Sequence, residues 1–276
     1  MSKHFHLTIV TPRAVASNNR GDNDGSTQAN LQIVSFGNKI YSTVSGDAIR
    51  WGLREYLQYH YPKEMNRTYC PEADKYTFKD EKFSRDFIDD DVMGYMDAKA
   101  GNKRRGILEV TRAISLDKFE EDVIFSSTGG EKNSNSIHQA QVHYTSYQYS
   151  ITITPDDLKE PSTLGKLLDA VAHIKHVGGN HARFLYSFAP ESIAIRVTHD
   201  PAPRIMNIFK RDGEGVDASR LLRVVQSGDV TPDELIVGGE IAYSSVGKDL
   251  ANLGVHVFPG IKEAIKKAKE RYEGSC

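Results

Sequence analysis

A polar loop near the N-terminus holds the residues that come closest to a catalytic motif. Residues 17–30 contain no large apolar side chain, and Asp22 and Asp24 lie two residues apart within them. A calcium loop that began at Asp22 would need glycine at its sixth position and glutamate at its twelfth, but Thr27 and Ile33 stand there. The calcium motif therefore fails. Two carboxylates in one loop also suit a magnesium-assisted nuclease, although this pattern alone is unspecific.

Other enzyme motifs give weaker signals. His173 and His176 lie three residues apart, Asp169 precedes them by one helical turn, and His181 follows. A metal site would need more carboxylate or cysteine ligands at fixed spacing, so a solvated polar helix face explains these residues better. The nucleophile pattern G-x-S-x-G and the phosphate-binding patterns G-x-x-x-x-G-K-S/T and G-x-G-x-x-G do not occur. We therefore predict no catalytic residue, no metal and no cofactor.

Three places instead favour contact with a phosphate backbone. The first is the run Ser-Asn-Asn-Arg-Gly from residue 17, in which small hydrogen-bonding residues surround one cation. The second is a helix start at Ser45 and Gly46, where unpaired backbone N–H groups and the helix dipole attract phosphate. The third is the run Gly-Gly-Asn-His-Ala-Arg from residue 178, where glycines permit close approach of a ligand. Two turns and a helix cap without any ligand would explain the same residues.

The elements that must position these places follow a definite order. Apolar spacing predicts a strand at 5–10, a helix from Ser45 to Pro62, strands at 106–116 and 142–154, a helix from Pro161 to Gly178, and strands at 184–188 and 193–197. The main order is β-α-β-β-α-β, which is the ferredoxin-like or RNA-recognition arrangement. The usual RNA-recognition strand motif is absent, and Tyr147 and Tyr149 continue an apolar alternation, so we expect them in the core.

Further segments are added to this order. A hairpin is predicted at 31–44 around Gly37, and a polar loop at 126–141 separates two strands and has a length that is often functional. Residues 63–104 are highly charged and suggest an inserted, partly helical subdomain. After a loop at 200–215, a helix at 219–225, a strand at 235–242 and a basic helix at 261–272 complete the chain.

Composition limits the class of protein. The 276 residues carry 35 Lys and Arg against 37 Asp and Glu, so the net charge is −2 and any basic groove must be local. Only Cys70 and Cys276 are present, which favours a reducing cytosol. No stretch approaches the ~20 apolar residues of a membrane span, and the first five residues lack a signal-peptide core. We therefore expect a cytoplasmic globular protein with no membrane partner.

Several long runs resemble one known family. They are TIVTPRAVASNNRGDNDGSTQ, IYSTVSGDAIRWGLREYL, RRGILEVTRAISL, HYTSYQYSITI and GGNHARFLYSFAPESI. In collinear order they resemble the DevR-type members of the CRISPR-associated RAMP superfamily. That is the Cas-seven family, the backbone subunit of the type I Cascade surveillance complex, here similar to subtype I-B. The resemblance covers most of the chain and is weakest at 63–100 and beyond 200.

The resemblance implies an α+β fold shaped like a hand. A modified RNA-recognition (ferredoxin-like) palm would comprise 1–62 and 105–276, an inserted helical finger region 63–104, and a β-hairpin thumb 122–145. Copies would stack head to tail on CRISPR RNA and leave its bases free to pair with target DNA, for antiviral defence or RNA-guided targeting. Further Cascade subunits would be partners, and the chain would not be an enzyme.

The resemblance also implies which residues contact the guide RNA. The RNA-binding residues would be Ser17, Asn18, Asn19, Arg20, Ser45, Gly46, Arg50, Gly178, Gly179, Asn180, His181 and Arg183. The thumb residues would be Ser127, Thr128, Asn133, Asn135 and His138. Related type III subunits cut target RNA with an acidic residue after the first strand, so a metal-dependent ribonuclease that uses Asp22 and Asp24 is the alternative function. A single-copy RNA-binding regulator is a third.

Overall fold

A nine-stranded sheet forms the centre of the chain in a computed structural model that describes residues 2–18, 28–70, 72, 75–79, 82–128, 136–179 and 186–273. The strand order is β19-β18-β15-β1-β14-β11-β5-β4, with β10 also paired to β14. The central strand β1 (His4–Val10) is antiparallel to both β14 (Tyr147–Ile153) and β15 (Ser192–Thr198). On β1 the predicted apolar face is confirmed, because Phe5, Leu7 and Ile9 are fully buried.

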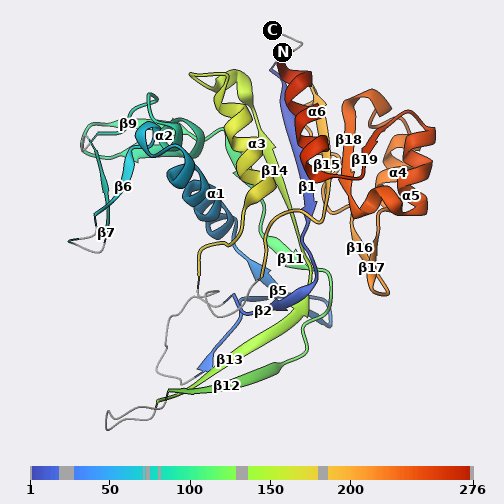
Figure 1. Cartoon of the computed structure of the whole chain (residues 1–276), viewed down its shortest axis with the longest axis horizontal. Helices are drawn as coiled ribbons and strands as arrows, with labels where there is room; N and C mark the ends of the chain where they lie inside the picture. Colours follow the sequence, from blue (N-terminus) through green and yellow to red (C-terminus); the bar gives the residue numbers. More distant parts are fainter. Residues whose placement is uncertain are drawn as a thin grey trace.

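Three helices cover one face of this sheet (Figure 1). They are α1 (Gly46–His60), α3 (Thr163–His173) and α6 (Ile261–Glu273), and their apolar sides share one core with β1 and β14. The predicted start of α1 is confirmed, since the Ser45 hydroxyl accepts a hydrogen bond from Ala48 N at 3.1 Å. The predicted end of α3 at Gly178 is wrong. The helix ends at His173. Ile174 and Val177 lie in the irregular segment that follows, and because they are buried too, they continue the apolar spacing of the helix.

The opposite face of the sheet has its own core. Helices α4 (Ser219–Gln226) and α5 (Ser245–Asn252) pack there beside β18 (Leu235–Gly239) and β19 (His256–Phe258). The short hairpin of β16 (Lys210–Asp212) and β17 (Gly215–Asp217) interrupts the loop expected at 200–215. The strand expected at 235–242 ends at Gly239, because Glu240–Tyr243 form a 3-10 turn.

Two predicted strands are each divided in two. Residues 106–116 form β10 (Leu108–Val110) and β11 (Ala113–Ser115), which pair with different parts of β14. The stretch 142–154 changes sheets, since β13 (Ser136–Thr145) pairs with β12 (Asp122–Thr128) and β14 joins the central sheet. The β12–β13 hairpin extends away from the central sheet in Figure 1. The hairpin of β4 (Ile33–Phe36) and β5 (Lys39–Val44) is confirmed.

Residues 63–104 were expected to form a helical finger region, but most of their regular structure is in strands. After a 3-10 turn at Pro62–Glu64, the segment consists mainly of two hairpins, β6 (Arg67–Cys70) with β7 (Lys75–Phe78) and β8 (Gly94–Asp97) with β9 (Asn102–Arg105). In the part of this segment that the structure describes, the six-residue helix α2 (Ile88–Met93) lies between them. Buried carboxylates organise this segment: Asp89 accepts from the backbone N–H groups of Asn66 and Arg67. Such long-range bonds leave no periodic signal in the sequence.

The segment after residue 185 also differs from its prediction. Residues 186–188 are not in a strand, although Tyr186 and Phe188 are buried. Tyr147 and Tyr149 are buried as predicted, and the Tyr149 hydroxyl donates to the Phe188 carbonyl at 2.9 Å.

None of the helices in the described part of the chain combines the length and apolar composition that a bilayer crossing requires. Strand β2 (Ala14–Ala16) and strand β3 (Gln28–Ala29) both pair with β13.

Candidate nucleic-acid interface

The start of α1 and the glycine turn at 178 lie together. The Gly178 N–H donates to the Ala48 carbonyl at 2.9 Å. A Cβ atom on Gly178 would lie 3.4 Å from Ala48 Cα and 3.5 Å from the Trp51 side chain, so the turn packs tightly on the first turns of α1. Gly179 has a φ of 118°, a conformation that favours glycine. The structure thus places the start of α1 beside Gly178 and Gly179, the first two residues of the third predicted place.

Two residues at the start of α1 serve the packing of the helix. A Cβ on Gly46 would lie 2.5 Å from the Val110 carbonyl, so glycine permits the close approach of α1 to β10. The guanidinium of Arg50 donates to the Leu108 carbonyl at 2.8 Å and to the Met93 carbonyl at 2.6 Å. These bonds connect α1 to β10 and α2. Both Nη groups of Arg50 are thus used within the fold, which differs from the phosphate contact expected for this residue.

The first predicted place is attached to the β12–β13 hairpin. Ser17 and Asn18 are 0% and 4% exposed, so their side chains lie inside rather than on a surface. The Ser17 hydroxyl donates to the Gln141 carbonyl of β13 at 2.9 Å. This contact ties the segment after β2 to the hairpin. Other predicted residues lie outside the described part of the chain: Asn19, Arg20, Asp22, Asp24, Asn133, Asn135, Asn180, His181 and Arg183, as do the side chains of Ser127, Thr128 and His138.

The histidines near α3 have aromatic and ion-pair neighbours. The Asp169 carboxylate accepts from Lys269 Nζ at 2.6 Å, and the His173 ring stacks on Tyr56 with centroids 5.9 Å apart. The His176 ring lies against Trp51 at 5.6 Å. Within the described ranges, no three His, Cys, Asp or Glu side chains come together as a metal site would require. These side chains therefore form a polar surface beside α1 and α3.

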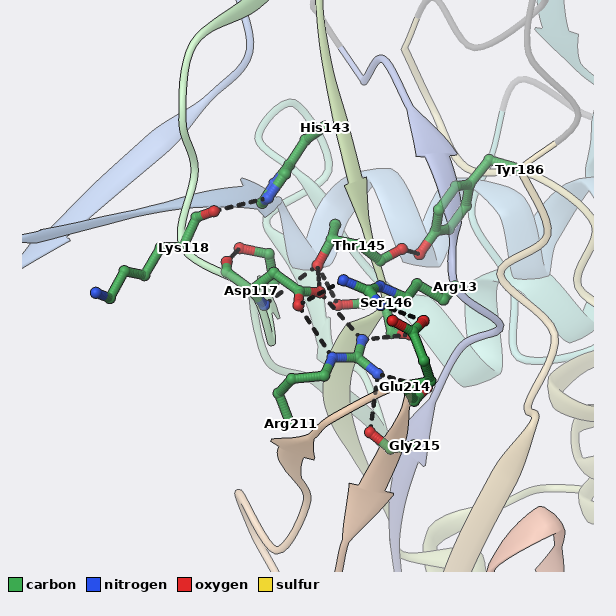
Figure 2. A network of polar contacts seen from close by, with 11 residues as sticks. Arg13, Asp117, Lys118, His143, Thr145, Ser146, Tyr186, Arg211, Glu214 and Gly215 are labelled. Carbon is green, nitrogen blue, oxygen red and sulfur yellow. Dashed lines mark hydrogen bonds and ion pairs between the residues drawn. The ribbon is translucent and has the colours of Figure 1, made fainter.

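A polar network at the base of the β12–β13 hairpin has no counterpart in the sequence predictions (Figure 2). Its centre is Asp117, which lies between β11 and β12. Asp117 Oδ1 accepts from Arg13 Nη2 at 3.2 Å and from Arg211 Nε at 3.0 Å. Asp117 Oδ2 accepts from Arg211 Nη2 at 3.0 Å and from the Thr145 hydroxyl at 2.8 Å. One carboxylate thus joins the N-terminal, middle and C-terminal parts of the chain.

The network includes Thr11, which precedes the predicted RNA-binding run from residue 17, and Tyr186, which follows the predicted run from residue 178. The Tyr186 hydroxyl donates to the Thr145 carbonyl at 3.0 Å and lies 2.7 Å from the Thr11 hydroxyl (Figure 2 shows Tyr186 beside Thr145). Thr11 directly follows β1, and Tyr186 begins the last described range. Arg13 also donates to Glu214 at 2.7 Å, and its guanidinium lies 4.6 Å from the centroid of the Tyr144 ring.

The electrostatics of this network favour an ionised carboxylate beside a neutral imidazole. Burial would raise the pKa of Asp117, but hydrogen bonds from Arg211 and Thr145 and the charges of Arg211 and Arg13 outweigh burial and lower it. Burial lowers the pKa of His143. His143 Nε2 faces the Lys118 carbonyl at 3.1 Å and must carry the proton, so Nδ1 accepts from the Ser42 hydroxyl at 2.7 Å. The hairpin base is therefore joined to β5 by neutral hydrogen bonds as well.

Comparison with known proteins gives the chain its family. No family model matches the sequence. A protein of Myxococcus xanthus (strain DK1622), named CRISPR-associated protein Cas7/Cst2/DevR, is 34% identical over 301 aligned positions that cover 99% of each chain. The chain belongs to the Cas7/Cst2/DevR family. This finding confirms the resemblance indicated by the sequence motifs and extends it over 63–100 and beyond 200, where the motifs are weakest.

Solved structures share the fold of this Cas7/Cst2/DevR chain. A chain of a "CRISPR RNA-guided surveillance complex, pre-nicking" has a TM-score of 0.66 at 12% identity, over 96% of this chain and 100% of its own. A chain of a "CRISPR RNA-guided surveillance complex" has a TM-score of 0.60 at 16% identity, over 96% and 99%. At these identities the comparison shows a common mixed α/β fold along nearly the whole length.

Proposed function

We propose that the chain is a backbone subunit of a CRISPR RNA-guided surveillance complex, where it binds the guide RNA. The observation that carries this proposal is the full-length match to a Cas7/Cst2/DevR protein. Two solved chains with the same fold come from RNA-guided surveillance complexes, which supports it. We further propose a type I complex similar to subtype I-B, other Cascade subunits as partners, and a cytoplasmic location.

The strand order supports an RNA-recognition-like palm. The central strands run β15-β1-β14-β11, each antiparallel to its neighbour, with α1 and α3 on one face. This is the arrangement that a β-α-β-β-α-β chain adopts in a ferredoxin-like sheet. In the hand-like description, β12–β13 is the thumb and residues 63–104, with their hairpins, are the fingers.

The guide would be held through its phosphates at the α1 start. A helix N-terminus attracts anions, and the adjoining turn at Gly178 and Gly179 allows a backbone to approach. Arg20 and Arg183 are the proposed phosphate cations, since Arg50 is engaged with backbone carbonyls. Ser, Thr and Asn side chains at the thumb tip suit contact with any base. Such binding is indifferent to guide sequence and leaves bases free to pair with target DNA.

Assembly on RNA tests the proposed function directly. We expect the purified chain, produced together with a guide RNA, to elute as large particles that contain RNA of mixed sequence, because copies would stack head to tail along the guide. The measurement is size-exclusion chromatography with absorbance at nucleic-acid and protein wavelengths, followed by extraction of the RNA. A single monomer peak without nucleic acid, with guide supplied, would contradict the proposal.

The proposed subunit does not cut RNA. We expect the assembled wild-type protein to leave complementary RNA intact in magnesium or manganese, and the double substitution Asp22→Ala with Asp24→Ala to leave guide-directed DNA binding unchanged. The family match favours a scaffold, and carboxylates in one loop are an unspecific signal. Gel analysis of labelled complementary RNA is the measurement. Metal-dependent cleavage that either single substitution abolishes would establish the ribonuclease instead.

Salt dependence tests the phosphate contacts. Arg20→Ala should weaken binding about equally for guides of unrelated sequence. It should also reduce the slope of log binding constant against log salt concentration by roughly 0.7 per subunit, because binding without this phosphate contact releases fewer counterions. Arg20→Lys should recover part of the loss. Titrations of two guides at several salt concentrations measure both effects.

Arg223→Ala is the matched control for these titrations, because Arg223 is exposed on α4, away from α1. It should leave affinity and salt slope unchanged. An effect of Arg20→Ala on one guide and not the other would show that Arg20 reads bases.

A further inference from the structure

The chain passes from the thumb hairpin to the central sheet through one residue. Strand β13 ends at Thr145 and β14 begins at Tyr147, so only Ser146 separates them. On one side of Ser146 the chain pairs with β12 and β2, and on the other side with β1 and β11. Thr145 and Ser146 are both 0% exposed. The direction of the hairpin relative to the sheet is therefore set at this buried junction.

Hydrogen bonds of the junction come from other segments. The Thr145 carbonyl accepts from the Tyr186 hydroxyl at 3.0 Å, and the Ser146 carbonyl accepts from Leu116 N at 2.9 Å. Tyr147 N donates to the Thr11 hydroxyl at 2.9 Å. A buried polar group that lost its partner would be costly, so these bonds allow few orientations of the two strands.

Asp117 connects the start of β12, the first strand of the hairpin, to the same junction. It lies in the connection that leads from β11 into β12, and its carboxylate accepts from the Thr145 hydroxyl of β13 at 2.8 Å. Arg211 of β16 donates to both Asp117 and the Ser146 hydroxyl, the latter at 3.0 Å. Both ends of the hairpin thus meet one carboxylate, and the C-terminal β16–β17 hairpin supplies the cation.

We propose that Asp117 is the positioning residue that fixes the angle between the thumb hairpin and the central sheet, with Arg211 and Arg13 as its partners. The consequence for the guide rests on the proposed function: a thumb at a fixed angle meets the guide at the same place in every copy. The C-terminal segment thereby controls the thumb through Arg211, although it lies on the other side of the sheet from α1.

Removing the charge of Asp117 should weaken the contacts that hold the hairpin base. The side chains of Arg13 and Arg211 are only 22% and 16% exposed, and both donate to the same carboxylate oxygen. In Asp117→Asn the side chain keeps its size, but the two largely buried arginines lose the anion that they share and repel each other. The neutral amide at residue 117 can no longer accept charge-assisted hydrogen bonds from both arginines and a hydrogen bond from Thr145. The hairpin base should then open while the two cores stay packed.

A distance measurement between thumb and palm tests the proposal. Nitroxide labels would be attached at Phe125→Cys on β12 and Tyr59→Cys on α1, both strongly exposed positions, after serine replaces Cys70 and Cys276. Pulsed dipolar spectroscopy on the RNA-free chain should give one narrow distance distribution. Asp117→Asn should broaden it or move its maximum, and Arg211→Lys, which keeps the charge and loses the fork, should broaden it less.

Asp169→Asn is the matched control, because Asp169 forms a partly buried ion pair with Lys269 between α3 and α6. It should leave the distribution narrow. An unchanged distribution in both Asp117→Asn and Arg211→Lys, with circular dichroism showing folded proteins, would overturn the proposal. If Asp117→Asn does not fold, Arg211→Lys decides alone. A wild-type chain that fails to bind RNA would refute the proposed function and leave this distance test valid.

Discussion

Replacing residues 127–139 by a short Gly-Ser turn should abolish target-DNA binding by the assembled particle and leave a folded chain. The replacement removes the outer residue pairs of the β12–β13 hairpin, including Ser127↔Ile137 and Phe125↔Gln139, and keeps the pairs from Asp122↔Val142 to Ile124↔Ala140. The Asp117 network at the base is untouched. Circular dichroism and thermal unfolding measure the fold, and a mobility-shift titration with complementary DNA measures binding.

The control for this replacement is another exposed hairpin tip. Residues 98–101 connect β8 and β9 and are exposed, and Figure 1 shows that β9 lies far from the β12–β13 hairpin. The same Gly-Ser replacement there should leave target binding unchanged. A thumb-replaced particle that assembles and binds target DNA like the wild type would reject the assignment of β12–β13 as a thumb that organises the guide.

Local signals predicted the elements that depend on neighbouring residues. The Ser45 cap, the Pro62 stop and the β4–β5 hairpin follow from spacing and turn chemistry within a few residues, and the structure confirms all three. The apolar alternation of β1 is confirmed for the same reason. In each case the physical cause lies inside the segment, so one sequence is sufficient.

Elements set by distant partners were not predictable in this way. The alternation from Val142 to Thr154 passes through Ser146 without interruption, yet the chain changes sheets there because Tyr186, Leu116 and Arg211 bond the junction from elsewhere. Residues 63–104 were expected to be partly helical, but they form mainly short hairpins, and the buried Asp89 of α2 bonds the backbone at the start of β6.

The candidate site shows the same division. Sequence reasoning found the helix start and the glycine turn separately, and the Gly178–Ala48 bond shows that they lie together. Arg50 was assigned to the guide RNA only by the family resemblance, and the structure gives it partners within the fold. The carbonyls that Arg50 contacts belong to Met93 and Leu108, far along the chain. Asp117 carried no motif at all, since its partners are Arg13, Thr145 and Arg211.

Gly52→Ala should destabilise the chain by about 1–3 kcal/mol, because an added methyl has no room in a packed core. A Cβ on Gly52 would lie 2.2 Å from the His176 carbonyl and 3.1 Å from Ile174 Cδ1. Alanine favours a helix interior by up to ~1 kcal/mol over glycine, but this gain is smaller than the expected clash. Relief requires the segment before Gly178 to move away from α1, so guide affinity should fall as well. Urea unfolding and RNA titration measure the two effects.

Gly165→Ala separates the clash from the general effect of adding a methyl group to a helix. Gly165 lies in the first turn of α3, where a Cβ would meet only Lys269 Cε at 3.9 Å. This variant should be as stable as the wild type or more stable by up to ~1 kcal/mol, with unchanged guide affinity. Equal stability of Gly52→Ala and Gly165→Ala would show that α1 does not hold the 174–178 segment by close backbone contact. Loss of guide affinity in Gly52→Ala alone would connect that contact to the RNA, since the methyl lies beneath the turn rather than on its surface.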